Sequence, residues 1–153
     1  MPVIYLETFV AAPVTVVFDL SRSVDLHQVS TSQTQEVVVA GRLKGLLEIG
    51  ESVTWRAKHF GIIQNLSSMI TEFNAPYNFT DEMVHGAFKC FKHIHRFEVT
   101  GDGTTMIDVF SYQSPLGLLG KLADWLFLKK YMTQLLSVRN QVIKQYAENN
   151  IPI

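Results

Sequence analysis

The sequence predicts an α+β fold in which a curved antiparallel sheet of about seven strands wraps around one long C-terminal helix. The first observation is the helical spacing of apolar residues over 115–148, a stretch with no Gly or Pro after Gly120. The second is a series of strand-like runs over 35–112, separated by turn residues. The helix would be on the order of 45 Å long, and it cannot bury its apolar side alone. We therefore expect the strands to form the surface that holds it.

The elements follow in a simple order from the N-terminus. Residues 3–10 are rich in β-branched and aromatic types, which favour a strand. Pro13 then opens a short helix at its first position, where the missing N–H costs nothing, and residues 22–29 form a second short helix or turn. A meander of antiparallel strands needs a cover over its buried face, and only the long helix can provide it. The remaining strands are expected over 35–40, 51–60, 62–73, 77–84, 88–100 and 104–112.

Two segments allow more than one interpretation. The loop 41–50, punctuated by glycines, is interpreted as a flexible lip. Its leucines Leu43, Leu46 and Leu47 either fold over a pocket mouth or form a small apolar cluster. The first half of the long helix, 116–128, is apolar nearly all round. It allows three interpretations, which are plain core, the portal of a pocket, or a homodimer surface, and core with portal is favoured.

Composition limits the function classes. Apolar residues make up 47% of the chain and charged residues 18%, as in a compact globular protein, so we expect residues 1–153 to form one domain. Thirteen basic and fourteen acidic residues give a net charge of −1, without the basic surplus of a nucleic-acid-binding surface. The single cysteine, Cys90, excludes an internal disulfide and a cysteine-based zinc site.

The sequence also bears on location and assembly. The start of the chain alternates instead of running apolar, so we expect no targeting segment. No stretch of about 18 uncharged apolar residues is present, so we expect no membrane-spanning helix. Together with the lone cysteine, these features favour a cytoplasmic protein, present as a monomer or homodimer.

Strand parity predicts which side chains face the helix, because residues two apart on a strand share a face. Trp55 and His59 lie on the apolar face of their strand. A two-residue turn at 60–61 pairs Trp55 with Leu66 and places Gln64 on the same inner face. These four side chains should therefore line one part of the concave surface.

The strand 88–100 carries Lys, Arg and Glu on one face, which belongs in water. His93 and His95 therefore point inward, together with Phe91 and Phe97. Two polar rings on an apolar face need partners, water or a ligand, because an unpaired buried polar group is costly.

The next turn determines what faces these histidines. The dipeptide Asp102-Gly103 is a strong hairpin signal. It predicts the pairs Asp108 with Phe97, Phe110 with His95 and Tyr112 with His93. Asp108 would then lie diagonal to His95, within reach of its ring. Asp81 lies on the neighbouring strand, and whether it shares this face depends on a register that stays open.

Several stretches carry a resemblance to a known superfamily. They are Ala12-Pro13 followed by Val17-Phe18, TWRAKHFGI (54–62), ITEFNAP (70–76), DEMVHGAFKCFKHIHRF (81–97) and SPLGLLGKLADWLFLKKYM (114–132). With the element order, they resemble the START-related helix-grip superfamily (SRPBCC, or Bet v 1-like), and within it the bacterial ligand-binding SRPBCC or polyketide cyclase/dehydrase-like group. The resemblance covers the whole chain and implies a helix-grip fold. Members carry hydrophobic small molecules, and a minority catalyse cyclisation or dehydration, with no shared catalytic motif to carry over.

We therefore expect this chain to bind a hydrophobic or amphipathic small molecule (lipid-like, aromatic or polyketide-like) in a cavity between the sheet and the C-terminal helix. Apolar side chains would form the wall, and polar ones would orient a head group. The expected ligand-binding residues are Trp55, His59, Gln64, Leu66, Asp81, Phe91, His93, His95, Phe97, Asp108, Phe110, Tyr112, Trp125 and Met132.

The alternative is an enzyme of cyclase or dehydratase type in the same cavity. His95 and Asp108 would be its acid/base pair, with His93 as a further candidate. The spacing of His93, His95, His59 and Asp108 also allows a metal site. Histidines beside rings and carboxylates are more often simply hydrogen-bonded, so we expect no metal and no cofactor. No serine-nucleophile motif, phosphate loop or dinucleotide fingerprint is present.

The remaining reactive and charged residues receive structural roles. Cys90 faces outward by parity, and Asp25 and His27 are expected at the surface or as caps. A third hypothesis is that the long helix mainly serves partner or dimer contacts. It predicts a shift between monomer and dimer when Leu119 or Phe127 is replaced by a charge, and a monomer throughout would contradict it.

Overall fold

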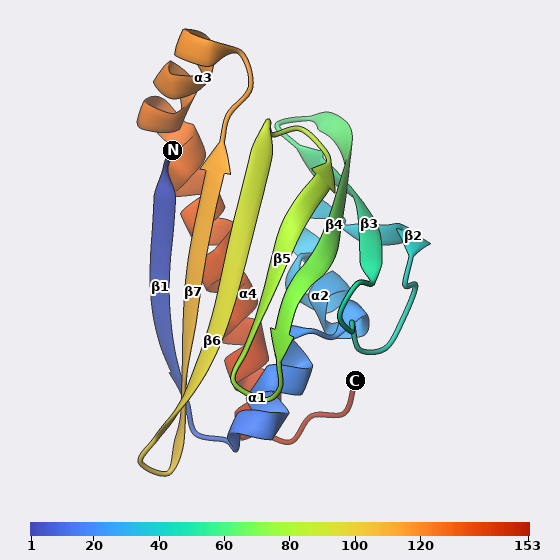
Figure 1. Cartoon of the computed structure of the whole chain (residues 1–153), viewed down its shortest axis with the longest axis vertical. Helices are drawn as coiled ribbons and strands as arrows, with labels where there is room; N and C mark the ends of the chain where they lie inside the picture. The colour runs from blue at the N-terminus through green and yellow to red at the C-terminus, as the bar shows by residue number, and fades with distance from the viewer.

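The computed structural model describes residues 1–153 and confirms the predicted α+β architecture (Figure 1). Seven antiparallel strands form one sheet in the order β1-β7-β6-β5-β4-β3-β2. This sheet curves around the C-terminal helix. Each predicted strand is present, with ends displaced by a few residues at most. The strands are β1 (Val3–Val10), β2 (Val37–Gly41), β3 (Ser52–His59), β4 (Ile62–Asn74), β5 (Asn78–His85), β6 (Cys90–Thr100) and β7 (Gly103–Gln113).

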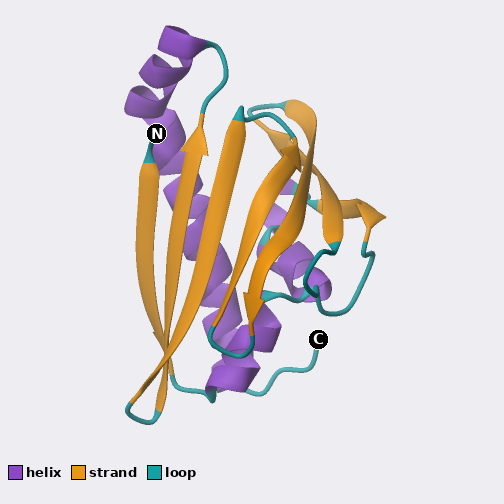
Figure 2. Ribbon diagram, viewed as in Figure 1, coloured by secondary structure: helices purple, strands orange, loops and turns teal.

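The helices lie on the concave side of the sheet (Figure 2). Helix α4 packs against β1, α1 and α2. The helical elements are α1 (Val14–Ser21), α2 (Val24–Ser30), the single turn η1 (Ser32–Thr34), α3 (Gly117–Ala123), the π-helical segment η2 (Asp124–Leu128) and α4 (Lys129–Glu148). The last three follow one another directly, so they form the long C-terminal helix that the sequence predicts.

The two short helices begin at local signals. Pro13 is the N-cap of α1, one position earlier than predicted, and its missing N–H leaves no donor unpaired there. Ser23 caps α2, because its hydroxyl oxygen accepts a hydrogen bond from the N–H of Leu26 at 3.1 Å. Helix α1 lies across one end of the sheet, where it contacts β6 and β7, and α2 follows it and contacts β2 (Figure 1).

That end of the sheet is filled by an aromatic core around Phe18, which is 1% exposed. The rings of Phe73, Phe79 and Phe97 lie edge-on to it, with centroids 5.4, 5.6 and 5.4 Å away. Edge-to-face packing of this kind stabilises the core beyond simple burial. Since this end is packed solid, open space between sheet and helix is left toward the other end.

The predicted register of β3 with β4 is confirmed. Trp55 pairs with Leu66, and Ala57 pairs with Gln64. The residues of the two-residue turn, Phe60 and Gly61, both have positive φ, 51° and 77°, as such hairpin turns require.

The predicted register of β6 with β7 is wrong by two residues. The chain turns at residues 101–102, so Thr100 pairs with Gly103. Gly101 takes the left-handed position, with φ of 58°. Gly103 instead lies inside the strand against β1, where an added Cβ would meet the carbonyl oxygen of Val10 at 2.4 Å. This close approach of β1 determines which glycine makes the turn.

A shift of two residues leaves every side chain on its predicted face, since faces alternate with a period of two. It does change the neighbours. Asp108 lies directly opposite His95 instead of diagonal to it. Asp81 pairs with His93, which answers the open register question. The observed pairs of β6 with β7 are Phe97–Met106, His95–Asp108, His93–Phe110 and Phe91–Tyr112.

Contrary to the favoured prediction, the first half of the C-terminal helix is not core. Leu118, Leu119 and Trp125 are 82%, 69% and 81% exposed, because α3 extends past the end of the sheet (Figure 1). The preceding link folds back tightly on α3, so that a Cβ on Gly120 would meet the carbonyl oxygen of Pro115 at 2.0 Å. Neither this helix nor any other has the length and apolar character needed to cross a bilayer.

The loop 41–50 packs against the start of α2. Leu47 is buried, and its N–H donates to the carbonyl of Arg22 at 3.0 Å. The N–H of Val24 donates to the carbonyl of Gly45 at 2.9 Å. Leu47 joins the main apolar core, whereas Leu43 is 59% exposed, so the three leucines do not form a separate cluster. No residue of the loop lines the cavity described below.

Candidate functional site

A cavity of about 310 Å³ lies between the concave face of the sheet and α4. Its exposed lining residues are Phe60, Asn65, Ala87 and Pro115. They lie at or near the β3–β4 turn, the β5–β6 turn and the link from β7 to α3. The mouth of the cavity is therefore at the end of the sheet from which α3 projects (Figure 1).

Most of the predicted ligand-binding residues line this cavity. They come from β3, β4, β5, β6, β7 and α4, which shows that parity placed them on the correct face. The predicted residues on the lining are Trp55, His59, Gln64, Leu66, Asp81, Phe91, His93, Phe110 and Met132.

The other predicted residues do not line it. Trp125 is on the projecting part of the helix and faces outward. Phe97 is buried in the aromatic core, and Tyr112 is fully buried with no hydrogen-bond partner for its hydroxyl. His95 and Asp108 are 2% and 1% exposed, and they lie one layer deeper than the cavity surface.

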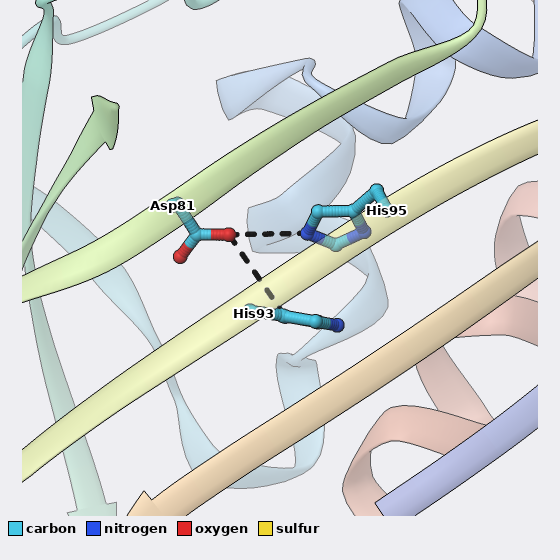
Figure 3. A group of neighbouring side chains, drawn as sticks. All are labelled: Asp81, His93 and His95. Atoms are coloured by element: carbon cyan, nitrogen blue, oxygen red, sulfur yellow. Dashed lines mark hydrogen bonds and ion pairs between the residues drawn. The ribbon is translucent and has the colours of Figure 1, made fainter. Parts of the chain in front are cut away.

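Asp81, His93 and His95 point toward one another beside the cavity (Figure 3). Asp81 comes from β5 and the two histidines from β6. Nε2 of His95 lies 3.1 Å from Oδ1 of Asp81, and Nδ1 of His93 lies 3.9 Å from the same oxygen. The two imidazole centroids are 3.8 Å apart. With Asp108, these residues are called the Asp–His cluster below.

Asp108, on β7, contacts both histidines of the cluster. Its Oδ1 accepts a hydrogen bond from Nε2 of His93 at 2.9 Å. The same oxygen lies 2.8 Å from Nδ1 of His95, an ion-pair contact without the alignment of a hydrogen bond. Its Oδ2 accepts from the side-chain amide of Asn140 at 2.6 Å, and the Arg139 guanidinium lies 3.8 Å from Oδ1. One buried carboxylate therefore satisfies several buried polar groups.

The two histidines differ in their protonation. Because a carboxylate only accepts, Nε2 of His93 carries the proton of its hydrogen bond to Asp108, and Nδ1 is left to accept. Burial and the neighbouring charge of His95 lower the pKa of His93 to about 4. Burial also lowers the pKa of His95, but its contacts with Asp108 and Asp81 outweigh burial and raise the pKa above its ordinary value. The cluster thus pairs a neutral ring with a more basic one.

Both carboxylates of the cluster are ionised. Burial alone would raise the pKa of Asp108, but the contacts with His93 and His95 hold it well below its usual range. The pKa of Asp81 is also lowered despite burial, by the hydrogen bond with His95 and by the nearby Arg139 charge. With His95 protonated, two anions face two cations, which offsets much of the cost of burying them.

A second polar group lines the cavity on the side of β2 and β3. Contrary to the surface or capping role predicted for it, His27 packs against Trp55 with ring centroids 4.2 Å apart and planes tilted by 30°, and its Nε2 lies 3.2 Å from Glu36. Burial would raise the pKa of Glu36, but the pairing with His27 lowers it. Nδ1 of His59 lies 2.8 Å from the hydroxyl of Tyr131, and burial lowers the pKa of His59.

Asp81, His93 and His95 have the geometry to hold a metal ion, since one ligand atom from each lies within 4.8 Å of the others. The hydrogen bond from His93 to Asp108 would orient its ring, as carboxylates do for metal-bound histidines. His59 is not part of this group. The same side chains are also paired with one another through the Asp–His cluster, which is the hydrogen-bonded arrangement expected from the sequence.

No protein-family model and no curated protein sequence matches the chain. Solved structures match it along nearly its whole length. TTHA0849 from Thermus thermophilus gives a TM-score of 0.80 at 16% identity, over 99% of this chain and 100% of that one. Major latex-like protein 151 from Panax ginseng gives 0.70 at 13% identity, over 99% and 98%. Ara h 8.0201 gives 0.67 at 12% identity, over 95% and 97%.

The chain has the Bet v 1-like helix-grip fold. Identities this low establish the fold alone, so the chemistry of the cavity has to be argued from its own residues. In this helix-grip chain those residues include several that the sequence reasoning misses.

Arg139 and Asn140 are the most important of them. The sequence places Arg139 on the polar side of the helix, but it is 7% exposed and its guanidinium donates to the carbonyl of Ser21 at 2.8 Å. Asn140 falls between Leu136 and Ile143 at helical spacing, so the apolar stripe was the available signal for its burial.

His27 and Glu36 gave no such signal, because their burial depends on contacts between separate elements. Asp25 does not cap α2, which begins at the Ser23 cap; its carboxylate accepts from the N–H of Gly45 at 2.7 Å and ties the loop 41–50 to α2. Cys90 is exposed, as parity predicts.

Proposed function

We propose that this chain binds an amphipathic small molecule, with the apolar part between the sheet and α4 and the polar head at the Asp–His cluster. The observation that carries the proposal is the cavity of about 310 Å³, with largely apolar walls and a cluster of charged groups on one side. Protein interiors are otherwise close-packed, with few voids larger than a water molecule. An opening beside Phe60 and Pro115 gives the ligand a way in.

The polar side of the cavity favours a head group that donates a hydrogen bond. Nδ1 of His93 has a free lone pair, and Oδ2 of Asp81 makes no hydrogen bond within the protein. Arg139 also lines the cavity, but its guanidinium is already paired with Asp108 and the carbonyl of Ser21. An anionic head at Oδ2 of Asp81 would therefore be repelled by that carboxylate. We therefore propose a hydroxyl or amine head in preference to a carboxylate.

Long-chain alcohols are expected to displace Nile red from the protein on the order of tenfold more effectively than carboxylates of the same chain length, because like charges in a buried site are costly. Asp81→Asn is expected to reduce this preference, since the amide no longer repels an anion. Fluorescence titration of both series measures the difference. Equal displacement by alcohols and carboxylates would contradict the proposed head group.

Met132→Trp is expected to abolish Nile red binding, because the indole would enter the cavity that Met132 lines. The substitution is expected to lower the free energy of unfolding by only about 1 kcal/mol, since the ring enters open space. The matched control is Gln134→Trp, on the exposed side of the same helix, which should bind as the wild type does. Unchanged binding by Met132→Trp would place the probe elsewhere.

A second candidate function is acid–base catalysis on the same ligand, favoured by the opposite pKa shifts of His93 and His95. In a dehydration, Nδ1 of His93 would remove a proton from the carbon beside a carbonyl. The His95–Asp81 pair would protonate the leaving hydroxyl, so that water departs and a carbon–carbon double bond forms. A base with a pKa of about 4 removes protons weakly at neutral pH, which is why binding is the first proposal.

Turnover of β-hydroxy ketones, followed by absorbance of the enone, tests this candidate. The catalytic proposal expects His93→Gln to lose turnover while Nile red binding persists. Ligand binding without turnover by the wild type would leave the binding function alone.

A further inference from the structure

The cavity leaves one part of the chain unexplained, the helix tip of residues 116–128. Isolated exposed apolar residues are common, but a contiguous group marks an interaction surface. The exposed fractions of its apolar side chains run from 47% to 82%. These side chains are Leu116, Leu118, Leu119, Leu122, Trp125, Leu126 and Phe127.

The helix tip projects from the body of the protein. Figure 1 shows α3 beyond the end of the sheet, and the main contacts of α3 are with η2, the next segment of the same helix. Consecutive residues of a helix point about 100° apart, so the exposed side chains of Leu118 and Leu119 face different directions. A partner must therefore surround the helix tip on more than one side, which a fluid apolar phase does and a flat protein surface does not.

Positive charge gathers at this end of the molecule. The only acidic side chain of the helix tip is Asp124, whose carboxylate accepts from the hydroxyl of Ser114 at 2.6 Å. The chain as a whole carries a net charge of −1, so the cations are concentrated here and not spread evenly. The exposed lysines on or beside the helix tip are Lys89, Lys121, Lys129 and Lys130.

We propose that the helix tip inserts into the interface of an anionic lipid bilayer. Leucine, phenylalanine and tryptophan side chains with lysines around them are the composition of helices that lie in such interfaces, and each lysine near an anionic surface adds about fivefold in affinity. Trp125 would sit at the headgroup level. A second copy of the chain fits less well, since a two-fold dimer through this surface would bring the lysines of both copies together.

The mouth of the cavity lies beside the helix tip. Phe60, which lines the mouth, contacts Phe127 with ring centroids 5.4 Å apart. Docking would therefore bring the mouth against the bilayer, and an apolar ligand would pass between the two without crossing water. This consequence rests on the proposed function, whereas the docking itself does not.

Co-sedimentation with lipid vesicles tests the docking. The wild type is expected to bind vesicles of equal parts phosphatidylcholine and phosphatidylglycerol. Its affinity for pure phosphatidylcholine vesicles is expected to be lower by at least about tenfold. The double variant Leu119→Glu/Trp125→Glu is expected to lose at least about tenfold in affinity for the anionic vesicles. The matched control is Val99→Glu, which places a charge at an apolar site that is also exposed (67%), at the opposite end of the sheet.

Three results would overturn the proposal. They are retained vesicle binding by the double variant, equal binding to neutral vesicles, and a wild-type dimer that the double variant converts to a monomer without any vesicle binding. Nile red titration of the same proteins separates this proposal from the cavity. Failure of the docking leaves Nile red binding intact, and failure of the cavity leaves sedimentation intact.

Discussion

Asp108→Asn is expected to lower the free energy of unfolding by about 3–5 kcal/mol, the usual cost of removing one partner from a buried ion pair. The carboxylate is 1% exposed and contacts His93, His95, Asn140 and Arg139. An amide keeps the shape but removes the charge that offsets His95 and Arg139. It also presents an N–H where the Asn140 side chain already donates. Urea denaturation followed by circular dichroism measures the change.

The matched control is Asp102→Asn, in the exposed turn between β6 and β7. It removes the same charge at the surface, where substitutions usually change stability by less than about 0.5 kcal/mol. If Asp108→Asn lowers the free energy of unfolding by less than about 1 kcal/mol, the stability contributed by the cluster does not depend on this charge.

The free energy of unfolding is also expected to fall by on the order of 3 kcal/mol between about pH 6.5 and pH 4, because of His93. Its pKa is about 4 in the folded protein against an ordinary value of 6.5, so the unfolded chain takes up the proton first and acid favours unfolding. The lowered pKa values of Asp81 and Asp108 act in the same direction, since their contribution is lost as the pH falls through the folded values. The raised pKa of His95 acts oppositely, because its contribution is lost as the pH rises through the folded value.

His93→Gln is expected to flatten this part of the pH profile, because glutamine can still donate to Asp108 but cannot titrate. The comparison is His85→Gln, at an exposed position at the end of β5, which should keep the wild-type profile. Urea midpoints measured at several pH values give the result. A profile that keeps its acid slope in His93→Gln would assign the slope to other groups.

Local sequence patterns were enough to predict the fold, but they could not predict the register of β6 with β7, which depends on a contact with β1. Only one position for the two-residue turn, 60–61, fits the sequence between β3 and β4, and the pairing of Trp55 with Leu66 follows from it. After β6, residues 101–102 and 102–103 both satisfy hairpin chemistry. The carbonyl of Val10 on β1 decides between them, since only glycine fits beside it at position 103. Such a contact joins elements far apart in the chain, and turn chemistry does not contain it.

The site divides in the same way. Parity placed His93, His95 and Asp108 on the concave face, because that rule needs only the strand. It could not bury Arg139, whose charge is compensated by Asp108 and by the carbonyl of Ser21. Charged residues are rarely buried unless they are paired, so the sequence alone predicts an exposed side chain for Arg139. The sequence therefore predicted the inward direction of the two histidines better than the groups that shift their pKa values.

The π-helical segment η2 is wider than the α-helix on either side of it, and it contains an extra residue relative to a regular α-helical path. In a regular helix, Trp125 and Leu128 would share a face, being three residues apart. Instead, Leu128 lines the cavity and Trp125 faces outward. The segment acts as a phase shift, so that one continuous helix presents two apolar surfaces in different directions. Without this segment, the same residues in a regular α-helix would turn the helix tip by about 100° relative to the cavity wall of α4.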